Sequence, residues 1–505
     1  MNISAAKQVI KDTVLIYLKK NDEGDYCIPV VRQRPIFLLG APGIGKTAIM
    51  EQIASELGIA LVSYSMTHHT RQSALGLPYI TKKEFGGKEY PITEYTMSEI
   101  IASVYETIEN SGISEGILFL DEINCVSETL GPSMLQFLQY KTFGRHRVPD
   151  GWVIVTAGNP PEYNRSVREF DVATLDRLKV ISVDPDLKVW REYAYGKNIH
   201  GAVLGYLDVK KDDFYVMEMS QSGRSYVTAR GWEDLSEMLR LCEEEEITAD
   251  ETLVSQYLRS ERVSKDFSAY YDMYKKYKKD YRISDILAGQ PSPGIIGKAS
   301  NAGFDERLSV LGMLFDAVCA DMRNAMEKAD MISLVRPVLS SVKQRASEEK
   351  GADGILSIFR AASESAAKKM HSLKTAGALS DEERRKLKGS LALYDDMARA
   401  VNDASCDSAS AAFLVIKQIY EKKVSVLRKE VEKSSLELSN VISFVREAYK
   451  DGNEPVILAT KLTSDQWSSR FIASFGNSDY EELARDMELS ERGNDLKEKI
   501  MNLEL

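Results

Sequence analysis

The residues best suited to chemistry begin with a glycine-rich loop. Residues 40–47 read Gly-Ala-Pro-Gly-Ile-Gly-Lys-Thr, which fits the pattern GxxxxGK[ST] in full. Glycines let such a loop curl so that its N–H groups face phosphate oxygens, while the lysine holds phosphates and the threonine hydroxyl binds Mg²⁺. We therefore predict a site for ATP with Mg²⁺. Its predicted binding residues are Gly40, Ala41, Pro42, Gly43, Ile44, Gly45, Lys46, Thr47 and Ala48.

Two adjacent acids supply the second half of this chemistry. Asp121 and Glu122 directly follow the apolar residues 117–120. Acids at the end of a buried strand lie at the sheet edge where ligands bind. We predict that Asp121, with Thr47, binds Mg²⁺ and that Glu122 deprotonates the attacking water. Two acids at the end of a strand often mark only the start of a solvated loop. Because the glycine-rich loop is present in the same chain, we favour the catalytic interpretation.

Three further polar residues follow apolar segments or open a helix. Asn159 comes after the apolar residues 152–157, where its amide could touch both the γ-phosphate and the attacking water. Arg177 immediately precedes another apolar stretch. Arg230 lies at the start of an amphipathic segment. An arginine in such a place is either a ligand for phosphate or a member of a surface ion pair.

The elements that must position these residues alternate between strands and helices. Strands are predicted at residues 35–39, 59–63, 117–120, 152–157 and 180–183. Strands separated by helices indicate βαβ units around a parallel, buried sheet. The predicted fold class is therefore an α/β P-loop NTPase core with a small helical lid, followed by a mainly α-helical C-terminal region. The lid is expected to hold one short strand near residues 214–217.

The second half of the chain shows helical periodicity. Apolar residues recur at three- and four-residue steps from Ile416 to Val445, which predicts one long helix. Residues 289–303 are rich in Gly, Pro and Ser and form the best linker candidate. We predict four parts. They are a nucleotide-binding core at 1–185, a lid at 186–247, a helical connector at 248–290 and a helical region for partner docking or oligomerisation at 291–505.

In their order and spacing, these motifs resemble the AAA+ superfamily. The likeness rests on GAPGIGKT, LFLDEIN, VTAGNPP, TLDRL and VTARGWEDL, and it covers about residues 1–245. Within the superfamily the chain resembles the MoxR-type branch and its dynein-like and midasin-like relatives. The resemblance implies that Asn159 is sensor 1, that Arg177 is the finger reaching a neighbouring subunit's nucleotide, and that Arg230 is sensor 2.

A finger that acts on a neighbour implies a ring, usually a hexamer. Arg145, Arg165 and Arg168 are rivals for the finger. The span from Arg177 to Arg230 is short for MoxR proteins, which leaves open whether Arg230 acts on its own subunit or on the next.

Two insertions fit the same branch. Residues 77–95 alternate around Gly86-Gly87 and predict a β-hairpin, and a second insertion is expected at 140–151. The resemblance implies that the first hairpin faces the pore of a ring, where Phe85 would contact substrate. An ordinary surface hairpin fits the pattern equally well.

Composition narrows the class of protein. The net charge of −11 and pI near 5.3 argue against a protein that coats nucleic acid. Five scattered cysteines indicate a reducing compartment, and no apolar run reaches the roughly 20 residues of a membrane span. We expect a cytoplasmic protein. Residues 274–279 mix lysines with tyrosines and fit either a nucleic-acid contact or a solvated helix face.

Three functions remain in view. The first is a MoxR-like ATPase that remodels, activates or assembles a client protein. The resemblance implies that such a client often carries a von Willebrand factor A domain. The second is a nucleic-acid motor or restriction-type NTPase, which the acidic pI disfavours. The third, a nucleotide-gated scaffold with little turnover, is disfavoured because both Asp121 and Glu122 are present.

Overall fold

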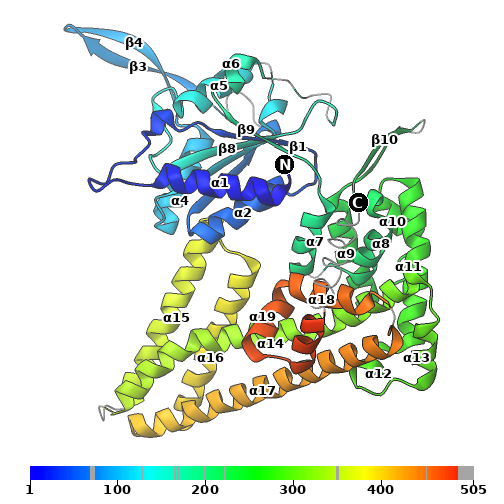
Figure 1. The fold of residues 1–505 in the computed structure, drawn as a ribbon. Helices are drawn as coiled ribbons and strands as arrows, with labels where there is room; N and C mark the ends of the chain where they lie inside the picture. The colour runs from blue at the N-terminus through cyan, green and yellow to red at the C-terminus, as the bar shows by residue number, and fades with distance from the viewer. Residues whose placement is uncertain are drawn as a thin grey trace, which may run out of the picture. The chain divides into compact units, whose positions relative to one another are not determined.

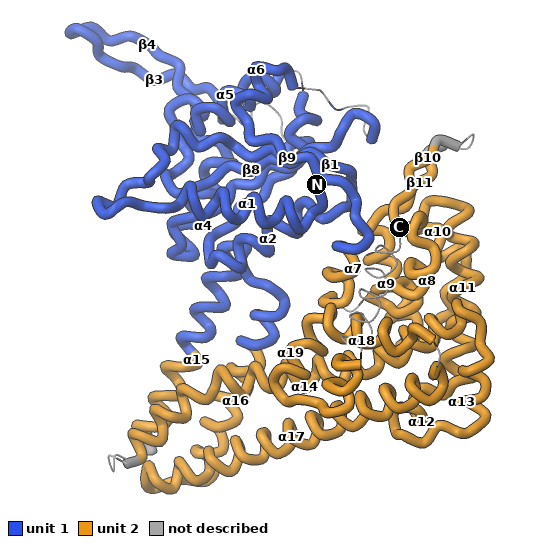
Figure 2. The backbone as a smooth tube through the Cα atoms, in the orientation of Figure 1, with its two compact units in different colours: residues 1–189, 364–387 blue, residues 190–363, 388–505 orange. Residues whose placement is uncertain are grey.

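The chain forms two compact units. The computed structural model describes residues 1–68, 74, 76–127, 129–163, 167, 170–197, 199–220, 223–347, 352–450 and 452–486. Unit 1 contains residues 1–189 and 364–387, and unit 2 contains residues 190–363 and 388–505 (Figure 2). A parallel α/β core is followed by a mainly helical region, as predicted (Figure 1). In the described ranges, no helix has the length and apolarity to cross a membrane. The predicted boundaries after residues 185, 247 and 290 stay predictions.

Unit 1 is built on a five-stranded parallel sheet in the order β2-β5-β8-β1-β9. Each strand lies within two residues of a predicted one. Their bounds are β1 Ile36–Gly40, β2 Ala60–Ser65, β5 Gly116–Asp121, β8 Trp152–Gly158 and β9 Lys179–Val183. All seven residues of β8 are buried, which is why the central strands read as apolar runs without alternation.

Helices and two small hairpins surround this sheet. The helices are α1 Ile3–Leu18, α2 Lys46–Leu57, α4 Glu99–Ser111, α5 Gly131–Tyr140 and α6 Val172–Leu175. The antiparallel strands β3 Pro78–Phe85 and β4 Lys88–Tyr95 confirm the hairpin predicted at 77–95. A smaller hairpin, β6 Thr142–Phe143 and β7 His146–Arg147, lies within the predicted second insertion.

Unit 1 also includes the turn between two helices of the C-terminal region. The N–H of Leu61 in β2 donates to the carbonyl of Ala376 at 2.7 Å, and the Ser372 hydroxyl donates to the carbonyl of Ser111 at 2.5 Å. β2 is an edge strand, so this turn covers backbone groups that would otherwise face solvent.

Unit 2 begins with a small mixed subdomain. Its elements are α7 Leu187–Gly196, whose first turn lies in unit 1, α8 Gly201–Val209, β10 Val216–Ser220, β11 Gly223–Val227 and α9 Ala229–Glu244. The strand expected at 214–217 is β10, and it pairs with β11, which we did not predict. α9 begins where the Thr228 hydroxyl accepts the N–H of Gly231, a side-chain cap, and it buries one apolar face.

The rest of the described chain is helical. Its labelled helices are α10 Glu251–Tyr257, α11 Glu261–Tyr281, α12 Ile283–Leu287, α13 Pro293–Ser300, α14 Phe304–Ser347, α15 Ala352–Thr375, α16 Asp381–Asp403, α17 Ala409–Ala448, α18 Glu454–Ser464 and α19 Gln466–Phe475, and residues 478–486 are helical as well. They belong to unit 2, except that residues 364–387, which include the second half of α15 and the start of α16, belong to unit 1. α14 and α17 pack against each other, and α17 confirms the predicted long helix. Its two ends enter different cores, one around Ile416 and one around Val441.

The prediction of a linker at residues 289–303 is wrong. Most of this stretch forms α13, whose Ile295 and Ala299 are buried in the same core as Val441. Pro293 occupies the first turn of the helix, where a missing N–H costs nothing, so a proline here starts a helix and does not interrupt the fold.

Candidate functional site

The glycine-rich loop joins the end of β1 to the start of α2. Gly43 and Gly45 have φ angles of +73° and +93°, which only glycine adopts without strain. Gly45 precedes α2 and has no side chain to cap it, so the first N–H groups of the helix are left for another acceptor. A loop with these features suits a phosphate group, because backbone donors and the helix dipole favour an anion there.

Lys46 ties this loop to the end of a second strand. Its side chain is only 8% exposed, and its ammonium donates to the carbonyls of Gly40 at 2.7 Å and Ala41 at 3.0 Å. It also donates to Oδ1 of Asn159 at 2.7 Å. The structure therefore brings together the predicted lysine and the predicted sensor amide, which are 113 residues apart in the chain.

Thr47 and Asp121 form the candidate metal site. The Thr47 hydroxyl donates to Oδ2 of Asp121 at 3.1 Å, where β5 ends beside the start of α2. A hydroxyl and a carboxylate side by side are hard oxygen donors of the kind that Mg²⁺ binds, with water and phosphate oxygens completing the shell. The donor set therefore fits Mg²⁺.

Glu122 has an uncommon backbone conformation. Its φ and ψ of 55° and 35° lie in the left-handed region, which is rare for a residue with a side chain. The carboxylate accepts hydrogen bonds from the hydroxyls of Ser65 at 3.3 Å and Thr67 at 3.0 Å. The strained turn aims the carboxylate across the carboxyl edge of the sheet, toward the end of β2.

Ser65 and Thr67 lie in the candidate site and were not predicted from the sequence. The predicted strand ended at residue 63, two positions short of β2, so its last hydroxyl was left outside the site. The carboxyl ends of neighbouring parallel strands meet at one edge, and β2 pairs with β5. The polar residues just after each predicted strand could therefore have been used to predict these site residues.

Cys125 lies near the acids, in surroundings that disfavour its thiolate. Burial raises the pKa of its thiol, and the charges of Glu122 and Asp121 raise it further. A thiol with a raised pKa stays protonated at neutral pH and reacts poorly.

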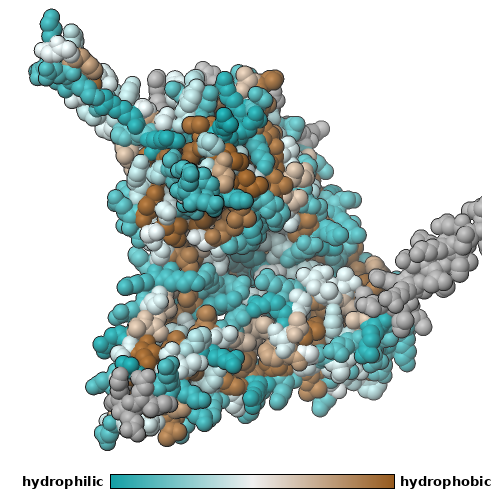
Figure 3. Space-filling view, turned by 60° about the vertical axis from the view of Figure 1, so that its left-hand side comes forward, coloured by the Kyte–Doolittle hydropathy of each residue, from teal (hydrophilic) through white to brown (hydrophobic). Residues whose placement is uncertain are grey.

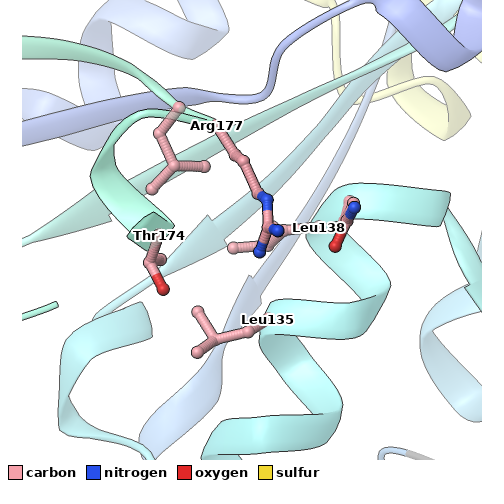
Figure 4. Close-up of a pocket in the computed structure, with 6 residues that line it drawn as sticks. Leu135, Leu138, Thr174 and Arg177 are labelled. Carbon is pink, nitrogen blue, oxygen red and sulfur yellow. The ribbon is translucent and has the colours of Figure 1, made fainter. Parts of the chain in front are cut away.

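The candidate finger is exposed. Arg177 follows α6 and points toward α5, and it lines a small pocket together with Leu135, Leu138 and Thr174 (Figure 4). Its guanidinium forms no ion pair with any residue that the structure describes. Among its rivals, Arg145 is paired with Glu94 of the β3–β4 hairpin. Arg165 and Arg168 lie outside the described residues.

Arg230 belongs to unit 2, while the other site residues belong to unit 1. It is the second residue of α9 and is exposed. Its role as sensor 2 stays a prediction.

The β3–β4 hairpin exposes several large side chains. Phe85 is 56% exposed beside the Gly86-Gly87 turn, and its ring lies 6.3 Å from that of Tyr90. The projecting hairpin is mostly hydrophilic, with a few more hydrophobic residues toward its free end (Figure 3). By contrast, Tyr274 in the tyrosine- and lysine-rich stretch is buried in α11, which removes one aromatic ring from the suggested nucleic-acid surface.

Comparison with protein families gives a match on this part of the chain. Residues 35–178 match the model of the AAA domain of the dynein-related subfamily, which covers less than a third of the 505 residues. The matched range contains the glycine-rich loop, the acidic pair, Asn159 and Arg177. Comparison with curated protein sequences gave no match. The chain therefore contains an AAA+ ATPase domain, whose glycine-rich loop and acidic pair meet at the carboxyl edge of the sheet.

Proposed function

We propose that this chain hydrolyses ATP in a ring oligomer and uses the resulting motion to remodel, activate or assemble a client protein. The observation that supports hydrolysis is that the site residues meet at one sheet edge. Lys46 hydrogen-bonds to Asn159 at 2.7 Å, Thr47 hydrogen-bonds to Asp121 at 3.1 Å, and Glu122 directly follows Asp121. A nucleotide-gated scaffold would need the loop and Asp121 but would have no use for a carboxylate held as Glu122 is.

Each side chain has a distinct task in this proposal. Lys46 exchanges its neutral oxygen partners for phosphate oxygens, which bind an ammonium more strongly because they carry charge. Thr47 and Asp121 hold Mg²⁺, which neutralises charge on the phosphates. Glu122 accepts the proton of the attacking water, and Asn159 orients that water. The hydroxyls of Ser65 and Thr67 hold the Glu122 carboxylate until it is needed.

The ring is supported by Arg177. Its guanidinium is exposed and forms no ion pair within the described ranges, so it is available to a neighbouring subunit. Arginines that reach a transferred phosphate from another chain stabilise charge that develops in the transition state. We propose a hexamer because the AAA+ relatives that the chain resembles usually form one.

The proposal of a client protein rests on the resemblance to MoxR-like ATPases and on an exposed surface of unit 1. MoxR-like ATPases often act on proteins with a von Willebrand factor A domain, and the exposed Phe85 hairpin offers a contact surface. The helical region after residue 290 supplies a second surface for docking or oligomerisation.

A trap variant tests the client. Glu122→Gln, tagged and recovered from native cells with ATP present, is expected to retain a stoichiometric protein partner. Lys46→Ala is the matched control and is expected to lose that partner, because it cannot bind the nucleotide that closes the ring. Recovery of DNA or a nuclease with the trap would replace the remodelling proposal with a nucleic-acid motor.

A further inference from the structure

Asn124 lies between the acidic pair and Asn159. It is the middle residue of the short 3-10 helix Ile123–Cys125, two positions after Glu122, and only 4% of it is exposed. Its Nδ2 donates to the backbone carbonyl of Asn159 at 2.8 Å. This side chain therefore links the turn that carries the base to the segment that carries the sensor.

The close fit of this link depends on Gly158. A Cβ added at Gly158 would lie 2.4 Å from Oδ1 of Asn124 and 2.7 Å from its Cγ, which is a severe clash. The Asn124 carboxamide thus lies flat against the end of β8. Any side chain at position 158 would push it away from Asn159.

The Asn159 carbonyl needs such a partner. Gly158 is the last residue of β8, and its partner Leu39 ends the ladder between β8 and β1. Asn159 lies beyond that ladder, so its carbonyl receives its hydrogen bond from the Asn124 side chain. Without that bond the Asn159 carbonyl would lose this partner, and the backbone that directs the Asn159 amide toward Lys46 would be held less firmly.

The Oδ1 atom of Asn124 indicates that this position needs a polar residue. Oδ1 is buried and has no hydrogen-bond partner among the described residues. Leaving a buried acceptor unpaired destabilises a fold. An apolar side chain of the same shape would avoid that destabilisation, so packing alone does not account for an asparagine.

We infer that Asn124 is a positioning residue that fixes the backbone of Asn159, so that the Asn159 amide stays directed at the phosphate and water site. This inference rests on the proposed hydrolysis of ATP. It assigns Asn124 no contact with substrate; it acts through Asn159. Because Asn124 follows Glu122 by two residues, the same link keeps the base and the sensor in register.

The test uses Asn124→Leu, which keeps the branched shape and removes the donor. We expect ADP to bind as it does to the unsubstituted protein, while kcat falls about tenfold, the effect of one buried hydrogen bond on a barrier. The preference for ATP over ADP should fall with it. Gly158→Ala, which displaces the same side chain from the other side, should reproduce both effects.

Asn477→Leu is the matched control. Asn477 is a similarly buried asparagine in unit 2, 7% exposed, whose Nδ2 donates to the carbonyl of Ser435 at 3.1 Å. Its substitution should lower the thermal unfolding midpoint and leave kcat unchanged. An Asn124→Leu protein with unchanged kcat and unchanged ATP preference would overturn the inference, because a residue that only fills space tolerates leucine.

A crystal structure of Asn124→Leu separates this inference from the proposed function. Movement of Asn159 Oδ1 away from Lys46 Nζ supports the positioning role even if the protein proves to hydrolyse no ATP. An Asn159 side chain still within hydrogen-bond distance of Lys46 would contradict the role even if ATP hydrolysis is confirmed.

Discussion

Two buried lysines, one in each unit, show how differently the chain uses the same group. Lys46 and Lys461 are each 8% exposed. Lys46 donates to two backbone carbonyls and an amide oxygen, all neutral. Lys461 donates to the carboxylate of Asp208 at 3.1 Å, and that carboxylate also pairs with Arg191. A phosphate can displace the neutral oxygens that Lys46 binds here, whereas Lys461 binds a carboxylate that also pairs with a second cation.

The pKa of Lys461 agrees with this view. Burial has the largest single effect and lowers the pKa of its ammonium, but Asp208, Tyr195 and Asp316 together outweigh burial and the net pKa is raised. Lys461 is thus held in its charged form by a fixed internal partner. A buried cation is a sign of function when its contacts are neutral and exchangeable, and a sign of structure when a carboxylate already satisfies it.

A comparison of two arginines of unit 1, Arg177 and Arg145, gives the largest expected effect on hydrolysis. Arg177→Ala in unit 1 should leave ATP binding unchanged and lower hydrolysis about a thousandfold, the size of effect seen for arginine fingers. A hydrolysis assay at saturating ATP, with the oligomeric state measured in parallel, checks this. Arg145→Ala is the control, since Arg145 is paired with Glu94 and should lose little activity.

Mixing experiments test whether Arg177 acts on a neighbour. Arg177→Ala subunits retain Glu122, while Glu122→Gln subunits retain Arg177. Activity that reappears on mixing would confirm action between subunits. Rings in which hydrolysis stays lost at every mixing ratio would assign Arg177 to its own subunit.

Lys461→Met should lower the unfolding free energy of unit 2 by about 3 kcal/mol, because it removes one partner from a buried ion cluster. Chemical denaturation followed by helical circular dichroism measures this. The affinity of the protein for ATP should stay the same within about twofold, which is below 0.5 kcal/mol. A Lys461→Met protein that unfolds like the unsubstituted protein would contradict a structural role for Lys461.

Lys46→Met is expected to do the reverse. Loss of its charged hydrogen bonds to phosphate should weaken ATP binding roughly a hundredfold, since such bonds are worth about 1.5–3 kcal/mol each. Stability should change little, because a flexible apolar chain of similar length fills the same space. Equilibrium titration with a fluorescent ATP analogue gives the affinity. Undiminished binding would show that the glycine-rich loop is not the nucleotide site.

A third buried lysine predicts a pH dependence. Lys141 is 4% exposed and donates to Gln33 and to the carbonyl of Trp152. Burial and, to a smaller extent, the charge of nearby Arg147 lower its pKa to about 8, against the opposing charge of Asp150. The unfolded chain, with an ordinary lysine pKa near 10.5, therefore binds more protons than the folded chain between these two values.

Stability from this group should accordingly rise as the pH rises from about 8 to 10.5, by about 3 kcal/mol. Lys141→Met should abolish that rise. The measurement is the difference in unfolding free energy between the two proteins across this range, because tyrosines that titrate nearby cancel in the difference. A difference that does not vary with pH would contradict the lowered pKa.

Much of unit 1 could be predicted from the sequence, for a physical reason. The strands of a buried parallel sheet are apolar throughout, so their ends are marked by the first polar residues, such as Asp121 and Asn159. Those polar residues then fall at one edge. The residues that we missed, Ser65, Thr67 and Asn124, act through contacts across strands, which spacing along the chain does not show.

In the helical region, the helices could be predicted from the sequence, but their packing into cores could not. The periodicity around α17 predicts a helix but not that Ile416 and Val441 enter separate cores. The Gly- and Pro-rich composition of residues 289–303 suggested a linker, whereas the apolar Ile295 lies in a core. Composition reports local preference, and tertiary packing of α13 outweighed it.

The most direct test of the central claim compares ATP binding and ATP hydrolysis in Glu122→Gln and the unsubstituted protein, with Mg²⁺ present. We expect the variant to bind ATP with nearly the same affinity and to hydrolyse it at least about a hundredfold more slowly, because a general base contributes an effect of this size. Near-normal hydrolysis by the variant, or no binding of ATP by the unsubstituted protein, would contradict the assignment of this site.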